Sequence, residues 1–400
     1  MEPHSTTDRD ATCEPDSATK PIAEVKTVLP GATIGMVGGG QLGRMFAMAA
    51  ATMGYDVVVF CDDAVDPAAQ VAHRCVTGAL DDPGCIDRFA QQCEVISLEF
   101  ENIPAETIAR CGQFAPTYPA ASVLATAQDR LDEKTTLQSA GLPVTPFAHV
   151  TDRISLVQAS ETLGWPIVLK TASGGYDGKG QHKLDTLEDA DSVPWSDCTH
   201  WVAEQFIPFQ QEISVVVART PGGETKCFPV FENEHANHIL DLTTLPASVD
   251  DSVADQAVRV ATTAAETLNV VGLLCVEFFV SDGQVMINEV APRPHNSGHV
   301  TIEACETSQF QQHVRAICNL PLGSTAMRCP AATMANLLGD CWNDEKNGPA
   351  WDRLLDVPGV CLHLYGKRIA KPGRKMGHLT VTGNDRQQVR EQAILARQSL

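Results

Sequence analysis

Short apolar runs alternate with helical stretches over the first part of the chain. Residues 32–37, 56–60 and 95–98 have the length and apolar content of buried strands. Between them lie stretches with helical spacing, the first of which runs to Met53. Regular alternation of strand and helix is typical of a parallel sheet covered by helices. We therefore predict a Rossmann-like α/β domain over residues 31–125.

Strand patterns dominate the middle of the chain. Helical spacing marks residues 128–139 and 253–268. The predicted strands are residues 166–171, 201–207, 212–218, 227–232, 272–280 and 284–290. Residues 126–325 are therefore predicted to form an α+β domain of about the usual size for one domain.

The two ends of the chain differ from this central part. Residues 331–338, 360–365 and 378–381 resemble strands, so residues 326–400 are predicted to form a small β-rich domain. Residues 1–30 are polar, with Pro3, Pro15 and Pro21 among them, and they lack the apolar segment of a secretory signal. We predict a flexible tail there.

Composition excludes several classes of partner. The 400-residue chain has a formal net charge of −21, which would repel DNA or RNA. No run of about 18 apolar residues is present, so a membrane span is not expected. The fourteen cysteines are scattered singly without a C-x-x-C pair, as in a cytoplasmic protein with reduced thiols. Small phosphorylated ligands remain compatible with this charge, since they need only a locally positive pocket.

A glycine motif follows the first predicted strand. Gly38, Gly40 and Gly43 have G-x-G-x-x-G spacing, and Asp62 ends the next strand, where a dinucleotide-binding protein places its ribose acid. Taken alone, this pattern favours an NAD(P)-binding oxidoreductase. The alternative is that the glycines only allow a tight turn and close packing of the helix.

A second glycine-rich segment follows the predicted strand that ends in Lys170. Residues 174–180 contain four glycines, whose backbone N–H groups can surround phosphate oxygens while Lys170 offsets their charge. Such a segment can close over a nucleotide as a lid. It lacks Walker A spacing. An ordinary glycine-rich hairpin is the alternative.

The next strand ends in Glu204, Gln205, Phe206 and Ile207, and Glu212 follows five residues later. The exposed backbone of a strand end can bind the edge of an adenine, and a carboxylate can accept from ribose hydroxyls. Solvated surface glutamates would be the alternative.

Two glutamates in the predicted hairpin 272–290 suggest a metal site. If residues 282–284 form a three-residue turn, Glu277 lies directly opposite Glu289 on one face, among apolar neighbours. Like charges in this position repel, and a divalent cation would reverse the sign of that interaction. A two-residue turn at Asp282 and Gly283 would instead put the glutamates on opposite faces.

Two further segments carry binding groups. Residues 290–299 combine His295, Asn296 and His299 with prolines and a glycine, which suggests a fixed loop that faces a substrate. Zinc binding is not expected, because partners at metal-site spacing are missing, and either histidine could be structural. Residues 367–375 hold five basic residues in an acidic chain and suit a phosphate monoester; a solvated basic turn is the alternative.

Taken together, these strings resemble a known family. The strings are Gly-Gly-Gly-Gln-Leu-Gly-Arg (38–44), Phe-Glu-Asn-Ile-Pro (100–104), Gln-Asp-Arg (128–130), Gly-Gly-Tyr-Asp-Gly-Lys-Gly (174–180), Glu-Gln-Phe-Ile (204–207), Ile-Asn-Glu-Val-Ala-Pro-Arg-Pro-His-Asn-Ser-Gly-His (287–299) and Gly-Arg-Lys-Met-Gly-His (373–378). In this order they resemble the N5-carboxyaminoimidazole ribonucleotide synthetases, ATP-grasp ligases of purine biosynthesis. The resemblance spans residues 31–383.

The resemblance implies a fold and a set of ligands. It implies a Rossmann-like N-terminal domain, a central ATP-grasp domain and a small β-rich C-terminal domain in a homodimer. The implied ATP site consists of Arg130, Lys170, Gly174, Gly175, Tyr176, Asp177, Gly178, Lys179, Gly180, Glu204, Gln205, Phe206, Ile207, Glu212, His235, Asn288 and Glu289. Glu277 and Glu289 would hold Mg²⁺, with Mn²⁺ as an alternative ion.

The resemblance also implies the second substrate. The residues expected to contact 5-aminoimidazole ribonucleotide are Tyr176, Asp177, Lys179, His295, Asn296, Lys367 and Arg374. Some family members carry arginine where this chain has Lys179, and lysine cannot make the bidentate contact of arginine.

The implied reaction is ATP-dependent carboxylation of the ribonucleotide with bicarbonate through carboxyphosphate. Lys170 would be catalytic, and Asp177 and His295 are the candidates for a base. A formate-dependent glycinamide ribonucleotide transformylase is the nearest alternative within the superfamily, and the loop of residues 295–299 argues against it. An oxidoreductase would leave Lys170 and the two glutamates unexplained.

Overall fold

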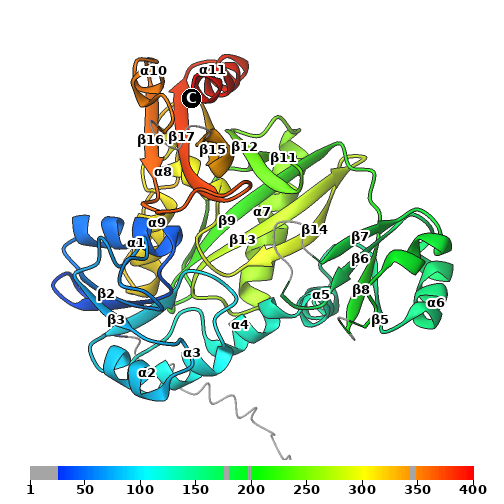
Figure 1. Cartoon of the computed structure of the whole chain (residues 1–400), viewed down its shortest axis with the longest axis horizontal. Helices are drawn as coiled ribbons and strands as arrows, with labels where there is room; N and C mark the ends of the chain where they lie inside the picture. Colours follow the sequence, from blue (N-terminus) through cyan, green and yellow to red (C-terminus); the bar gives the residue numbers. More distant parts are fainter. Residues whose placement is uncertain (1–25, 175–179, 197, 199, 343–347) are drawn as a thin grey trace, which may run out of the picture.

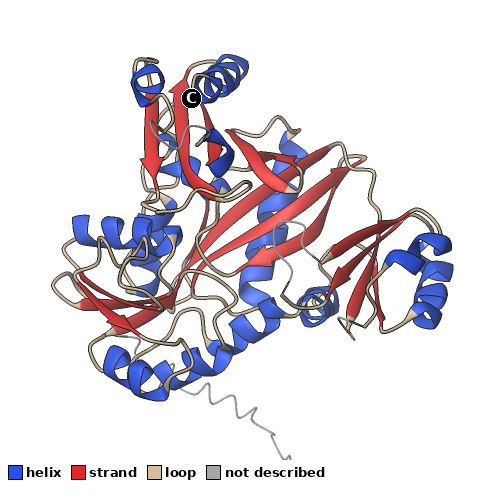
Figure 2. Cartoon of the chain, in the orientation of Figure 1, coloured by secondary structure: helices blue, strands red, loops and turns tan. Residues whose placement is uncertain are grey.

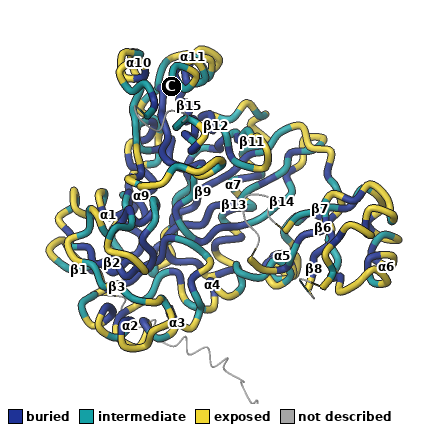
Figure 3. The backbone as a smooth tube through the Cα atoms, in the orientation of Figure 1, coloured by how far each residue is buried: buried dark blue, intermediate teal, exposed yellow. Residues whose placement is uncertain are grey.

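The computed structural model describes residues 26–174, 180–196, 198, 200–342 and 348–400. Figure 1 shows a long central sheet with the N-terminal sheet on its left, a smaller sheet on its right and the C-terminal strands above. Helices cover the sheets on their outer faces (Figure 2). The strands with the most extensive burial lie in the middle, as Figure 3 shows for β9 (Gln211–Arg219) and β13 (Gly272–Ser281).

The N-terminal sheet is parallel and has the strand order β3-β2-β1-β4. Its elements are β1 (Thr33–Val37), α1 (Gln41–Thr52), β2 (Asp56–Cys61), β3 (Arg74–Thr77), α2 (Pro83–Ala90), β4 (Val95–Leu98), α3 (Ala105–Cys111) and α4 (Ala121–Gln128). The three strands predicted here are confirmed, because each apolar run is buried on both sides by helices. The Rossmann-like fold class is confirmed with them.

Residues 1–25 of the predicted tail lie outside the described residues. Val28 is buried, and its N–H donates to the Cys318 carbonyl over 2.9 Å. The packed chain therefore reaches back past the boundary predicted at residue 31.

The smaller sheet is antiparallel, in the order β5-β8-β6-β7. Its elements are α5 (Arg130–Ser139), β5 (Phe147–Val150), α6 (Arg153–Leu163), β6 (Ile167–Thr171), β7 (Gln181–Leu184), the 3₁₀ helix η1 (Leu187–Ser192) and β8 (Trp201–Gln205). The helix predicted over residues 128–139 is interrupted at Asp129, whose carboxylate accepts from the Leu131 and Asp132 N–H groups and so starts α5. This cap places Arg130 at the beginning of a helix.

The long sheet has the order β14-β13-β9-β11-β12-β15-β17-β16, with β10 added to β9. Its remaining elements are β10 (Thr225–Cys227), β11 (Phe231–Ala236), β12 (Ile239–Leu245), α7 (Asp251–Thr267), β14 (Gln284–Ala291), η2 (Ser297–Val300), α8 (Thr301–Ala304), α9 (Gln309–Ile317), β15 (Ala331–Leu338), η3 (Gly339–Cys341), α10 (Trp351–Leu355), β16 (Val360–Leu364), β17 (Lys375–Gly383) and α11 (Arg386–Gln398).

Two features of this sheet differ from the sequence prediction. The strand predicted over residues 227–232 is wrong, because this stretch is divided between β10 and β11. The sheet also crosses the predicted boundary at residue 325, since β12 pairs with β15 from Leu242↔Ala335 to Leu245↔Ala332. The C-terminal strands are thus an extension of the central sheet.

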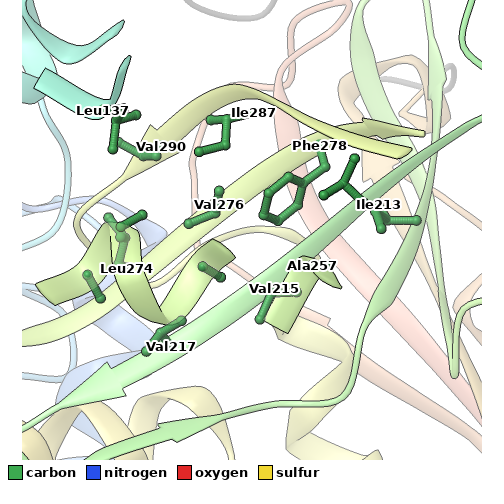
Figure 4. Packing of buried hydrophobic residues seen from close by; sticks show 14 of the residues in the cluster. Leu137, Ile213, Val215, Val217, Ala257, Leu274, Val276, Phe278, Ile287 and Val290 are labelled. Atoms are coloured by element: carbon green, nitrogen blue, oxygen red, sulfur yellow. The ribbon is translucent and has the colours of Figure 1, made fainter. Parts of the chain in front are cut away.

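Helix α7 packs against the central strands through a row of alanines. Ala257, Ala261 and Ala264 are fully buried, and small side chains on one helix face allow close approach to the sheet. Figure 4 shows how Val215, Val276 and the neighbouring apolar side chains fill the space between the strands and this helix. This core supports the end of β14.

Among the described residues, no helix is long and apolar enough to cross a membrane.

The turn between β13 and β14 corrects another prediction. Ser281 pairs with Gln284, so the turn has two residues, and both Asp282 and Gly283 have positive φ (49° and 73°). This is the pattern of a type I′ turn. The predicted three-residue turn is therefore wrong.

His313 joins the N-terminal sheet to α9. Its Nε2 lies 2.8 Å from Ser97 Oγ. The Ser97 hydroxyl donates its hydrogen to the Tyr118 carbonyl, so it can only accept from the histidine. Nε2 therefore carries the ring proton. Burial lowers the pKa of His313 to about 3, whereas an unfolded chain titrates near about 6.5. The contribution of the neutral His313 to the free energy of unfolding is fully present above about pH 6.5. It is lost as the pH falls toward 3, because over this range the unfolded chain takes up a proton on the histidine and the folded chain does not.

Between pH 7.5 and 5.5 we therefore expect His313 to reduce the free energy of unfolding by about 1 kcal/mol. The variant His313→Gln, whose amide can still donate to Ser97, should lose less stability over this interval. Urea unfolding of both proteins at the two pH values measures the difference. An equal loss in both would contradict the role given to His313.

Candidate active site

A cavity of about 940 Å³ opens between the smaller sheet, the long sheet and the N-terminal domain. Many of the residues singled out in the sequence line it: Arg130, Lys170, Gly174, Glu204, Gln205, Phe206, Ile207, Glu212, His235, Glu277, Asn288, Glu289, His295 and Asn296. They come from both sheets and the connections between them. The cavity is therefore the candidate active site.

The paired glutamates lie together, although the turn that was expected to pair them is absent. From Ser281↔Gln284 to Phe278↔Ile287 the register is that of a two-residue turn. A β-bulge then adds one residue, Asn288, to β14, so Glu277 lies opposite Glu289. The predicted pairing is confirmed, and its cause is the bulge.

Two lysines hold the bulged residue. Lys134 Nζ donates to the Asn288 carbonyl over 2.9 Å, and Lys170 Nζ donates to its side-chain oxygen over 3.2 Å. The backbone carbonyl of a bulged residue lacks its ladder partner, so the ammonium group replaces a lost hydrogen bond. Lys134 on α5 thus helps to set the register that brings the glutamates together.

Each glutamate has a cationic partner from the protein. Glu289 Oε2 lies 2.8 Å from Arg130 Nη1, and Glu277 Oε1 lies 2.8 Å from His295 Nε2. Burial would raise the pKa of Glu289, but Arg130 and Lys170 outweigh it and lower this pKa. The repulsion expected from the sequence is therefore already offset by protein side chains, without a metal ion.

His295 is held in place by the same geometry. Burial favours the neutral ring, but Cys275 and the Glu277 carboxylate raise the pKa of His295 above its ordinary value. Its Nδ1 lies 2.9 Å from Ser297 Oγ. Nδ1 also accepts from the Ser297 N–H over 3.3 Å, and Nε2 faces the Glu277 carboxylate as a donor.

Lys170 lies in a buried polar cluster behind the cavity. Its Nζ is 3.1 Å from Glu204 Oε2, which also accepts from the Thr145 hydroxyl over 3.0 Å. Lys134 Nζ is 3.4 Å from the same oxygen. Burial would raise the pKa of Glu204, but Lys134 and Lys170 lower it, so the carboxylate stays charged. Glu204 therefore fixes both ammonium groups.

Another part of the cavity wall combines apolar side chains with a carboxylate. Phe206, Ile207 and Phe209 line the cavity beside Phe279, whose ring stacks on Phe209 with centroids 4.6 Å apart. Glu212 Oε2 lies 2.8 Å from His235 Nδ1 on β11. A flat apolar slot beside a carboxylate suits a base and its ribose.

Asn296 and Arg293 have polar atoms without partners among the described residues. Both amide atoms of Asn296 are buried without a hydrogen bond, and so is Arg293 Nε. Arg293 is otherwise engaged by Glu101 and by the Pro294 carbonyl. Buried polar atoms without partners are costly, which suggests that a ligand completes them.

Gln309 fixes the loop of residues 295–299. Its Oε1 accepts from the His295 N–H over 2.9 Å, so its Nε2 donates to the His295 carbonyl and to His299 Nδ1. His299 is buried, and burial lowers its pKa well below the ordinary value. The ring is neutral, and its Nδ1 accepts from Gln309.

Five residues of the predicted site lie outside the described residues: Gly175, Tyr176, Asp177, Gly178 and Lys179. The two ends of that segment are anchored, since the Thr171 N–H donates to the Gly180 carbonyl and the Arg130 N–H to the Ala172 carbonyl.

The basic segment lies on the N-terminal domain. Lys367 and Arg374 are not part of the described cavity wall, whereas Lys375 is. The Gly366 carbonyl accepts from Gln70 Nε2 over 2.9 Å, and Lys367 donates to the Lys375 carbonyl over 2.8 Å. Lys367 and Arg374 interact electrostatically with two carboxylates of the N-terminal domain, Glu99 and Asp66 respectively.

The glycine motif does not offer a pyrophosphate site. The Glu99 carboxylate accepts from the Gly40 and Gly43 N–H groups at the start of α1, where a dinucleotide would bind. A Cβ at Gly38 would lie 2.4 Å from Glu99 Cγ, so glycine is required for this contact. The oxidoreductase alternative is therefore excluded by the protein's own carboxylate.

Sequence reasoning assigned no role to several polar residues of the site and its support, among them Glu101, Glu133, Lys134, Arg293 and Lys375. Glu101, Arg293 and Lys375 lie inside strings that were singled out, and Glu133 lies three residues after another. Lys134 looks like an ordinary helix residue, and only its complete burial reveals its role.

The fold and the paired carboxylates define an ATP-grasp protein. Family models match along the chain: the ribonucleotide synthetase preATP-grasp domain over residues 31–128, the ATP-grasp domain over residues 135–310 and the phosphoribosylaminoimidazole carboxylase C-terminal domain over residues 332–392. ATP-grasp enzymes use ATP and a divalent metal ion.

The chain belongs to the N5-carboxyaminoimidazole ribonucleotide synthetase family. It is 41% identical over 360 residues to the synthase of Brucella melitensis, covering 88% of this chain and 96% of that protein. It is also 40% identical over 393 residues to the bifunctional purine synthesis protein purC/E of Dictyostelium discoideum, covering 92% of this chain but only 38% of that protein's length.

Solved structures agree with this assignment. An ADP complex of an N5-carboxyaminoimidazole ribonucleotide synthetase has a TM-score of 0.87 and 41% identity, with 93% of this chain and 97% of that chain covered. The Aspergillus clavatus synthase in complex with ADP and 5-aminoimidazole ribonucleotide has a TM-score of 0.82 and 29% identity, with coverages of 92% and 99%. The resemblance inferred from the sequence is confirmed.

Proposed function

We propose that the protein carboxylates 5-aminoimidazole ribonucleotide with bicarbonate in purine biosynthesis, using ATP and releasing ADP and phosphate, with carboxyphosphate as the intermediate. Family membership and the Aspergillus clavatus complex support the substrates. The observation that carries the proposal is the set of buried Asn296 and Arg293 atoms without partners beside the glutamate pair. A site that bound only a nucleotide would not need these additional hydrogen-bonding atoms.

ATP is proposed to lie along the apolar wall. Phe206 and Ile207 would contact the adenine, Glu212 the ribose and His235 the rim of the nucleotide. Arg130 and Lys170 would point to the phosphates, where two fixed positive charges offset the charge of the moving γ-phosphoryl group. Gly174, Gly180 and the segment between them would close over the nucleotide and exclude water from carboxyphosphate.

The glutamate pair fits Mg²⁺, or Mn²⁺ in its place. Oxygen ligands from one or two carboxylates, completed by nucleotide phosphates, suit this ion, and Glu277 and Glu289 converge from neighbouring strands. When bound, the ion would offset negative charge on the phosphates. In this structure Arg130 pairs with Glu289 and His295 pairs with Glu277. When the ion binds, each carboxylate would either contact its protein partner and the ion together or move from that partner to the ion.

The second substrate is proposed to lie between Asn296 and the N-terminal domain. Lys367 and Arg374 would hold its phosphate, and Tyr176, Asp177 and Lys179 would reach it from the lid segment. His295 is a hydrogen-bond donor while paired with Glu277, so Asp177 becomes the preferred candidate for the base that takes the amine proton. His295 would orient the carboxyl group instead.

We further propose a homodimer in the cytoplasm, from family membership and the scattered single cysteines. The domain limits 31–125, 126–325 and 326–400 remain a proposal from the strand and helix patterns, with the long sheet continuing across residue 325 and the packed chain starting before residue 31.

Phosphate release from ATP tests the reaction. With Mg²⁺ and bicarbonate present, addition of 5-aminoimidazole ribonucleotide should stimulate release by at least about tenfold, since the amine consumes the activated carboxyl group. Glycinamide ribonucleotide with formate is the control substrate pair. Equal release with and without the aminoimidazole ribonucleotide would remove the substrate assignment.

A further inference from the structure

The C-terminal helix α11 presents a row of arginines toward the hairpin formed by β11 and β12. Arg386, Arg390 and Arg397 fall within an arc of about 40° on the helix. Val389, Ala393 and Ala396 lie beside this arc and pack α11 onto the long sheet. Figure 1 shows α11 above the sheet, next to the ends of β12 and β15. The helix therefore reaches the hairpin from the side away from the cavity.

Each arginine meets a carboxylate of the hairpin. Arg390 Nε and Nη2 each lie 2.6 Å from one oxygen of Glu234, which is a bidentate pair. Arg397 contacts both oxygens of Asp241, with Nη2 at 2.9 Å from Oδ2. Arg386 Nη2 lies 2.5 Å from Glu232 Oε1 without hydrogen-bond alignment. We call these three contacts the arginine clamp.

The far end of the same hairpin borders the cavity. His235, Asn237, His238 and Leu240 all line it. A register shift between Glu234 and His235 separates the residue held by the clamp from the residue that meets Glu212. Asn237 and His238 have positive φ (51° and 63°), which makes the tip a tight turn. Movement of the clamped strands would therefore displace the cavity rim.

We propose that the arginine clamp positions this hairpin for nucleotide binding, so that Arg390 and Arg397 of the C-terminal helix are positioning residues for ATP. The proposal rests on the placement of the nucleotide against His235. A bidentate pair restricts both the distance and the orientation of its two elements. The pairing of β11 with β9 ends at Asn233 and that of β12 with β15 begins at Leu242, so the outer part of the hairpin extends beyond its neighbouring strands. Neither Arg390 nor Arg397 lines the cavity.

The test compares steady-state kinetics of clamp variants with a control on the same helix. We expect Arg390→Ala to raise KM for ATP roughly fivefold and the double variant Arg390→Ala, Arg397→Ala roughly tenfold, with kcat and KM for the ribonucleotide within about twofold of the parent. Glu391→Ala is the control, because Glu391 accepts a hydrogen bond from Gln387 on the same helix and lies outside the three clamp contacts. It should change neither constant.

A charge exchange separates positioning from general damage. The pair Glu234→Arg with Arg390→Glu should restore most of the ATP affinity that either single variant loses, because the contact is rebuilt with reversed sign. Hydrogen exchange of residues 231–245 should be faster in Arg390→Ala than in the parent and should return toward the parent in the exchanged pair.

Two outcomes would overturn the proposal: an unchanged KM for ATP in the double variant, or equal increases in KM for ATP and for the ribonucleotide. His235→Ala separates this from failure of the proposed nucleotide site. If His235→Ala raises KM for ATP while the clamp variants do not, only the clamp is wrong. If neither changes KM for ATP, the placement of the nucleotide is wrong.

Discussion

Glu289→Gln is expected to lower ribonucleotide-dependent phosphate release about 1,000-fold, the largest effect of any single change considered for this protein. Glutamine has nearly the same shape but removes the negative charge that faces Glu277 across the strands. A divalent ion between the two positions would lose one anionic ligand. Arg130 would also lose its direct partner, Glu289 Oε2 at 2.8 Å, and would be drawn toward other carboxylates.

The measurement is kcat/KM for ATP over a range of Mg²⁺ and Mn²⁺ concentrations. The midpoint for metal activation should rise in Glu289→Gln, and added metal should recover part of the loss. Glu161→Gln on the exposed face of α6 is the matched control and should behave like the parent. A Glu289→Gln enzyme with the parent's metal dependence would show that the glutamate pair is not the metal site.

Asn296→Ala is expected to reduce kcat/KM for the ribonucleotide roughly 100-fold while KM for ATP stays within about twofold. Both polar atoms of Asn296 are buried without a partner among the described residues, so their hydrogen bonds are available for a ligand. Asn296 precedes η2 without capping it through its side chain, so its removal should cost little stability. The expected loss is therefore one of binding and catalysis.

Isothermal titration with the ribonucleotide, and phosphate release in its absence, distinguish the two contributions. Titration should show weaker binding, and the slow release without ribonucleotide should remain at the parent level. Asn296→Asp, which has the same shape but carries a negative charge, should bind less well still if the ligand atom nearby is anionic. Parent-like affinity in both variants would remove Asn296 from the substrate site.

Sequence patterns predicted the strands and helices that are specified by short runs of neighbouring residues. The runs at β1, β2 and β15 were recognised because buried strands need consecutive apolar residues, and the alternation with helices indicated the parallel sheet. The strand β12 and the helix α11 were missed. β12 contains threonines and an aspartate, and α11 is mostly polar, so neither has an isolated signal. Both depend on partners distant in the chain.

The glutamate pair shows how a correct site was inferred from an incorrect turn. Asp282 and Gly283 form the two-residue turn that sequence preferences favour, and this turn alone would separate Glu277 from Glu289. The bulge at Asn288 reverses that result. Its support comes from Lys134, whose carbonyl contact spans 154 positions of sequence. No pattern within the hairpin could have indicated it.

The sequence by itself determined the family, the Rossmann-like start, the strand that delivers Lys170 and the residue types available for chemistry, because these depend on short runs and on the order of motifs. Only the tertiary structure decided that Glu99 fills the glycine turn, that protein cations neutralise the glutamate pair, and that the C-terminal helix holds the rim of the cavity. Those outcomes arise from contacts between side chains far apart in the chain, where burial and nearby charge set the energy of each group.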